Sequence, residues 1–156
     1  MPYLQPEVAL DRIAGFTRNE IRSGIKDDRE FLQSQAGSMS STLRFLAREI
    51  EYREEAIAHQ RAVLDDALTT VATDASEMGA EAVREAASDA SSSLEGLETM
   101  DVYAVEQELL DAANDVLAVI DGSVDDEQAC RLREPLYEFI ECRLDEQLKM
   151  LGRDEE

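Results

Sequence analysis

Tryptophan is absent from this chain of 156 residues, and cationic side chains are scarce. Only 15 lysines and arginines accompany 36 aspartates and glutamates, which gives a net charge of −21, and only Lys26 and Lys149 are lysines. A surface this acidic repels nucleic acids and anionic membranes, because each phosphate contact needs a cation. We therefore expect neither a nucleic acid nor a membrane among the partners.

Long apolar runs and cysteine motifs are also missing. No run of about 18 apolar residues exists to form a membrane span, and residues 1–10 lack the pattern of a secretory signal. Cys130 and Cys142 form no Cys-x-x-Cys pair and have no histidine nearby in the sequence. We expect a cytoplasmic protein with two reduced thiols, no metal site and no cofactor.

Glycine and proline number only seven and three, and no segment alternates apolar with polar residues. This pattern predicts an all-α chain. Val, Ile, Leu and Phe together supply 37 large apolar residues, which is enough for a folded core. We expect a single domain over residues 1–156, built as a bundle of four or five helices.

The strongest periodic signal lies between residues 40 and 78, where apolar residues recur every seven positions as in a coiled coil. The spacing predicts one helix of about 40 residues, roughly 60 Å long. The other expected helices are about half this length, so they can cover only part of its apolar stripe. We expect a second copy of the chain to cover the rest, in a homodimer whose interface contains Leu43, Leu46, Ile50, Ile57, Leu64 and Val71.

The segment before this helix has an expected helix over residues 6–25. We expect it to direct five side chains to the core, namely Val8, Ile13, Phe16, Ile21 and Ile25. A short helical piece with Phe31 and Leu32 follows. Gly37 either ends that piece or lies inside one continuous helix.

Three more helices are expected in the C-terminal half. Gly79 breaks or bends the long helix, and a weaker helical pattern covers residues 83–97. A helix capped by Thr99 or Asp101 ends at Gly122, and the last one begins at Ser123 or Asp125 and continues to residue 152.

Charge is distributed unevenly along the chain. Residues 1–61 hold nine cations and ten anions, whereas residues 62–130 hold a single cation and eighteen anions. One interpretation is that the middle residues form the solvated outer faces of the bundle. The other is that the nearly neutral N-terminal third buries a helix–helix interface.

Catalytic motifs are absent: there is no Gly-x-Ser-x-Gly elbow and no Gly-rich phosphate loop. The single histidine, His59, follows Glu54 and Glu55 in a pattern that lacks the second histidine of a di-iron bundle. We expect it to pair with Glu55 on the helix surface. No catalytic residue is predicted.

Two arginine pairs are candidates for a ligand site. Arg18 and Arg22 lie one turn apart on the first expected helix, and Arg44 and Arg48 lie one turn apart on the long one, with Tyr52 nearby. Such pairs can hold a phosphate or carboxylate bidentately. Against this, simple salt bridges to neighbouring glutamates explain the same residues.

The acidic, lysine-poor composition resembles that of cytosolic proteins from halophilic archaea, whose cytosol holds molar salt. At molar salt the Debye length is about 3 Å, so the self-repulsion of such a surface is largely screened. The resemblance implies a protein that is firmly folded in high salt and looser in dilute buffer.

A second resemblance rests on residues 44–51, which read RFLAREIE, and residues 143–148, which read RLDEQL. These blocks are similar to ones in small uncharacterised helical proteins that bacteria pair with acyl-CoA dehydrogenases. The blocks and the short amphipathic helix before them cover about a third of the chain, and the spacing between blocks departs by about one turn.

Together these patterns favour a non-enzymatic interaction or accessory protein, partnered by its own copy or by another protein. The alternative is a helical bundle, acting as a binding protein or an enzyme, that holds an anionic small molecule through its paired arginines.

Overall fold

The computed structural model describes residues 5–152, except the side chain of Glu98. All regular structure in these residues is helical, which confirms the predicted all-α bundle with one long helix. Packing groups the chain into two compact units. The first contains the residues up to Arg53 and those from Gln147 onward, and the second is Glu54–Glu146.

The long helix, α3, spans Glu30–Met78 and is longer than predicted because it continues through Gly37. A methyl group at Gly37 would meet only the Arg22 side chain, at 3.8 Å, so nothing there forces the helix to end. Gly79 does end it, in the left-handed region with φ of 71°. The Gly79 and Ala80 amides donate to the carbonyls of Ser76 and Ala75, the hydrogen bonds of a Schellman cap.

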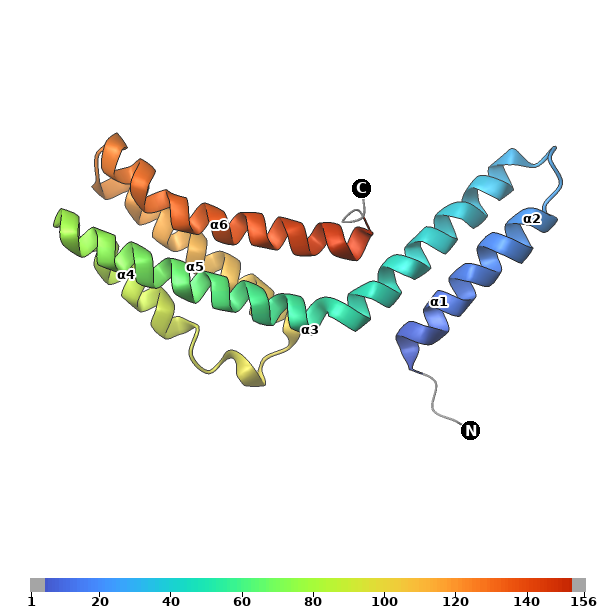
Figure 1. Ribbon diagram of the computed structural model, residues 1–156, viewed down its shortest axis with the longest axis horizontal. Coiled ribbons are helices and arrows are strands. Elements are labelled where there is room, and N and C mark those ends of the chain that lie inside the picture. Colours follow the sequence, from blue (N-terminus) through green and yellow to red (C-terminus); the bar gives the residue numbers. More distant parts are fainter. Residues whose placement is uncertain (1–4, 153–156) are drawn as a thin grey trace. The chain divides into compact units, whose positions relative to one another are not determined.

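The N-terminal hairpin, residues 5–53, consists of α1 (Pro6–Phe16), the π turn η1 (Thr17–Ile21), α2 (Arg22–Gly24) and the first half of α3. Its first arm runs antiparallel to α3 (Figure 1). The Ser40 hydroxyl donates to the carbonyl of Ala14 at 2.9 Å, and the Gln33 amide donates to that of Ile25 at 3.0 Å. These bonds fix the register of the two arms.

The buried residues of the hairpin are all small: Ala14, Thr17, Ala36, Ser40 and Ala47. The expectation that Ile13, Phe16 and Ile21 face the core is wrong, since all three are exposed, Phe16 to 57%. Small residues occupy the face of the first arm that meets α3, and the π turn adds a residue that shifts the register of everything after it. Val8 and Ile25 are partly buried.

The four-helix unit, residues 54–146, packs the second half of α3 with α4 (Glu81–Ser93), α5 (Val102–Ser123) and most of α6 (Asp126–Leu151) (Figure 1). A short 3-10 turn, η2 (Leu97–Thr99), precedes α5. One continuous core joins the four helices, and its most deeply buried large residues are Leu64, Leu68, Val71, Val83, Leu109, Val116, Ile120, Leu132, Leu136 and Phe139.

Half of the residues predicted for the dimer interface belong to this core. Ile57, Leu64 and Val71 are 5%, 0% and 0% exposed because α4, α5 and α6 cover the stripe from residue 57 onward. These three residues therefore cannot meet a second copy without unfolding the unit. Only Leu43, Leu46 and Ile50 of the predicted interface remain outside this core.

Aspartates cap the two C-terminal helices. Asp101 accepts a hydrogen bond from the Tyr103 amide at the start of α5, and Asp125 accepts one from the Gln128 amide at the start of α6. Of the alternatives left open by the sequence, these are the caps the chain uses. No helix among the described residues combines the length and apolarity needed to cross a membrane.

Ion pairs connect the helices of the four-helix unit. Arg131 contacts Asp74 at 2.9 Å, Arg133 contacts Asp121, and Arg143 contacts Glu106 at 3.4 Å. The single cation of residues 62–130, Arg84, donates to Glu81, and this hydrogen bond lowers the pKa of the Glu81 carboxyl. This unit thus has five cationic side chains for twenty-five carboxylates.

Candidate functional sites

An apolar stripe runs along the first half of α3. Its members follow one another at intervals of seven, four, three and four residues, so they share one face of the helix: Leu32, Met39, Leu43, Leu46 and Ile50. Ile50 is 52% exposed, and only Leu43 among the five is partly buried. We call this set the α3 stripe.

The stripe is adjacent to the face of α3 that carries the small buried residues. Ala36, Ser40 and Ala47 use that face against the first arm of the hairpin, which leaves the larger residues beside it unburied. Phe31, at the start of α3, is 72% exposed. The hairpin therefore presents large apolar side chains to solvent, while its fully buried positions hold only small residues.

The hairpin is also electrically balanced. Residues 5–53 carry eight cationic and eight anionic side chains, whereas residues 54–146 carry five and twenty-five. Exposed apolar residues and a net charge of zero occur together in the same 49 residues. A surface of this kind can approach another protein, including an identical one, without the repulsion that the rest of the chain would cause.

A cavity of about 470 Å³ opens between α1 and α3 within the hairpin. Three of the five predicted ligand residues line it, namely Arg44, Arg48 and Tyr52. The Nε atom of Arg44 is buried and has no hydrogen-bond partner in the described part of the chain. The cavity also contains a cation that the sequence did not single out, Arg12, and three carboxylates: Glu7, Asp11 and Glu51.

The other predicted pair lies elsewhere. Arg18 and Arg22 do not line the cavity, and the Arg22 side chain extends along α3 beside Gly37. Arg48 occupies the space next to Gly152, where a methyl group would overlap its guanidinium. The cavity therefore brings together Arg44 and Arg48 but neither Arg18 nor Arg22.

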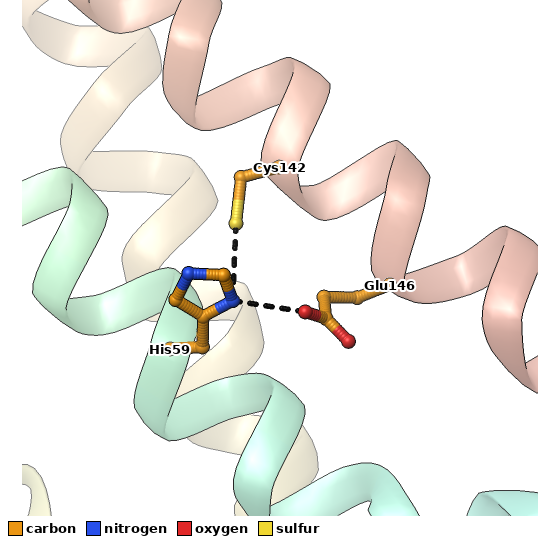
Figure 2. A group of neighbouring side chains, drawn as sticks. All are labelled: His59, Cys142 and Glu146. Atoms are coloured by element: carbon orange, nitrogen blue, oxygen red, sulfur yellow. Dashed lines mark hydrogen bonds and ion pairs between the residues drawn. The ribbon is translucent and has the colours of Figure 1, made fainter.

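A third candidate is a cluster of His59, Cys142 and Glu146 in the four-helix unit (Figure 2). His59 Nδ1 lies 2.9 Å from Glu146 Oε1 and 3.7 Å from Cys142 Sγ. The potential ligand atoms of all three residues lie within 4.8 Å of one another. His59 comes from α3, and the other two lie one turn apart on α6.

The expected pairing of His59 with Glu55 is wrong, because the carboxylate that contacts the imidazole belongs to Glu146. The sequence did not predict this cluster, because His59 and Cys142 are 83 residues apart and no histidine lies close to a cysteine along the chain. The only local signal was the one-turn spacing of Cys142 and Glu146, which is common on helices.

Comparison of the chain with protein-family models, with curated proteins and with solved structures finds no match. Function must therefore be argued from the three sites themselves.

Proposed function

We propose that this chain is a non-enzymatic interaction protein, adapted to high salt, that assembles through its N-terminal hairpin. One observation carries the proposal: the hairpin buries only small residues while the α3 stripe remains largely exposed. Two helices that bury so little gain little stability from each other, since most helix stability comes from burying an apolar face. A partner that covers the stripe supplies that missing burial.

A second copy of the chain fits this face for two reasons. A stripe spaced as in a coiled coil is self-complementary, so a two-fold axis can place it against its own copy. Each copy carries a charge of −21, yet residues 5–53 sum to zero, so the hairpins are where two such chains approach with least repulsion. The pairing of two hairpins would form a four-helix assembly.

Salt is part of this proposal. The twenty-five carboxylates of the four-helix unit repel those of a second copy, and molar salt reduces the range of that repulsion to about 3 Å. Salt also strengthens the burial of apolar surface. We expect assembly in the salt-rich cytoplasm that the composition implies, and dissociation in dilute buffer.

Variants of the stripe test the proposal. Leu46→Ser combined with Ile50→Ser should convert a dimer to a monomer in molar KCl, as measured by light scattering. The matched control is Leu144→Ser, because Leu144 is 53% exposed but belongs to the four-helix unit. An unchanged mass for the double variant, or a monomer caused by the control, would place the interface elsewhere.

A second candidate function has its own supporting observation. Arg44, whose Nε is buried and has no hydrogen-bond partner in the described residues, lines a cavity together with Arg48, Arg12 and Tyr52. This grouping of cations favours binding of a small molecule that bears a phosphate or carboxylate. The three carboxylates of the same cavity oppose a simple anion and favour a ligand with a cationic group as well. This is why we rank the assembly role first.

Calorimetry with inorganic phosphate and with a zwitterionic amino acid tests this candidate. Arg44→Ala combined with Arg48→Ala should abolish any heat of binding, whereas Arg18→Ala combined with Arg22→Ala should not, because that pair lies outside the cavity. Equal binding by both double variants would exclude the cavity as the site.

A further inference from the structure

The cluster of His59, Cys142 and Glu146 brings three different donor atoms to one point in the four-helix unit. The imidazole comes from α3, and the thiol and carboxylate come from one face of α6, as Figure 2 shows. The two α6 side chains both point toward the same imidazole nitrogen (Figure 2). A nitrogen, a sulfur and an oxygen within one small space are a ligand set that soft and borderline metal ions prefer.

The geometry does not suit a nucleophilic relay. In a Cys-His-carboxylate relay one ring nitrogen takes the thiol proton while the other donates to the carboxylate. Here Cys142 and Glu146 both meet Nδ1, so the second nitrogen takes part in neither contact. A single nitrogen cannot accept one proton and donate another at once. A shared coordination centre instead requires donor atoms grouped around one point, and the three donor atoms here lie within 4.8 Å of one another.

The carboxylate and the imidazole of the cluster differ in their exposure to solvent. The Glu146 side chain is 12% exposed, whereas that of His59 is 55% exposed. An ion held here would be fixed by α6 on one side and open to water on the imidazole side. Three protein ligands with one position left for water is the arrangement of an open zinc site.

From these observations we infer that His59, Cys142 and Glu146 bind one Zn²⁺ ion, with water as the fourth ligand. A thiolate and an imidazole select against Mg²⁺ and Ca²⁺, which take oxygen ligands. Zinc bonds of about 2.0–2.3 Å place tetrahedral ligand atoms about 3.3–3.7 Å apart. The Sγ–Nδ1 distance of 3.7 Å matches this spacing, and the Nδ1–Oε1 pair at 2.9 Å needs to open by only a few tenths of an ångström.

Binding involves a proton balance that can be measured. Zn²⁺ bonds to the Cys142 sulfur as the thiol proton leaves to buffer, and to the ionised Glu146 carboxylate. It bonds to Nδ1 of neutral His59, whose ring proton is then on Nε2 instead of in the hydrogen bond to Glu146. The two anionic ligands neutralise the charge of the ion. Cys130, which lies on the same helix but outside this cluster, has no such role and provides the matched control.

Cobalt titration tests the site with a readout that the many surface carboxylates cannot imitate. In molar KCl with excess Mg²⁺ to occupy weak carboxylate sites, one equivalent of Co²⁺ should produce a near-ultraviolet thiolate-to-cobalt charge-transfer band, and Zn²⁺ should displace it. Cys142→Ser should abolish the band, and Cys130→Ser should preserve it. His59→Gln and Glu146→Gln should each weaken Zn²⁺ binding by at least about tenfold.

Loss of the fold would not explain such results, because circular dichroism of each variant reports helix content independently, and Zn²⁺ should raise the melting temperature of the wild type but not of Cys142→Ser. Absence of a charge-transfer band in the wild type would overturn the inference. So would a band that survives in Cys142→Ser or disappears in Cys130→Ser.

Discussion

The two units of this chain use opposite packing strategies. The four-helix unit buries large aliphatic residues and Phe139 in one continuous core, while its surface carries twenty-five carboxylates. The hairpin buries alanine, serine and threonine, and the end of α6 adds the buried Met150 to the same unit. The hairpin presents most of its large apolar side chains outward and carries no net charge. The first resembles a finished domain, and the second resembles one half of a domain whose other half comes from elsewhere.

The difference is instructive because one helix takes part in both units. The heptad stripe of α3 continues from Leu43 through Val71, yet it is covered by helices of the same chain only from Ile57 onward. The same heptad pattern is therefore buried where other helices of the chain pack against it and exposed where they do not. Matched substitutions in the two units test this contrast.

The largest expected effect compares two phenylalanines. Phe139→Ala should lower the free energy of unfolding by about 3–5 kcal/mol, because Phe139 is fully buried and its loss leaves a cavity. Phe16→Ala should change it by less than about 0.5 kcal/mol in the monomer, because Phe16 is already exposed. Urea denaturation in molar salt at low protein concentration measures both.

Similar effects for the two variants would contradict the contrast between the units. A large loss for Phe16→Ala would show that the first arm of the hairpin buries this side chain in the monomer after all.

The next comparison uses two glycines of the long helical segment. Gly79→Ala should destabilise the chain by about 1–2 kcal/mol, because an alanine there must adopt a positive φ. Gly37→Ala should instead stabilise it by about 0.5–1 kcal/mol, because glycine inside a helix is unfavourable and a methyl group has room. Thermal unfolding followed by circular dichroism measures whether each substitution raises or lowers the stability. Destabilisation by Gly37→Ala would indicate that α3 is interrupted at that point.

The third comparison uses two buried polar residues of α3. Ser40 is hydrogen-bonded to the Ala14 carbonyl, so Ser40→Ala should lower stability by about 1 kcal/mol. Gln60 lies in the four-helix unit with a buried Oε1 that accepts no hydrogen bond in the described part of the chain, so Gln60→Met should raise stability by about 1 kcal/mol. Urea midpoints compared in the same buffer measure whether each substitution raises or lowers the stability. A loss of stability in Gln60→Met would reveal a hydrogen bond from Gln60 to water or to another molecule.

Much of the fold follows from the sequence by itself. The absence of alternating segments predicts an all-α chain, the heptad stripe predicts the long helix, and the aspartate caps lie at two of the positions that local capping rules allow. Gly37 and Gly79 illustrate where local rules stop. Either glycine can end a helix, but only Gly79 has the positive φ and the cap hydrogen bonds that end α3.

The sites were harder to predict because they depend on long-range contacts. Arg44, Arg48 and Tyr52 share a cavity because they are neighbours on one helix, and such proximity is readable from spacing. Arg12, from the other arm, and the meeting of His59 with Cys142 depend on how helices pack, which spacing does not encode. The exposure of Ile13 and Phe16 has the same origin, since periodicity marks an apolar face without stating what covers it.

The molar mass of the wild-type chain, measured by sedimentation equilibrium across a salt series, decides whether the hairpin pairs with its own copy. A hairpin that pairs with its own copy predicts twice the chain mass of 17.4 kDa in molar salt, with a shift toward the single-chain mass as salt is removed. A folded protein of 17.4 kDa at every salt and protein concentration tested would contradict the account.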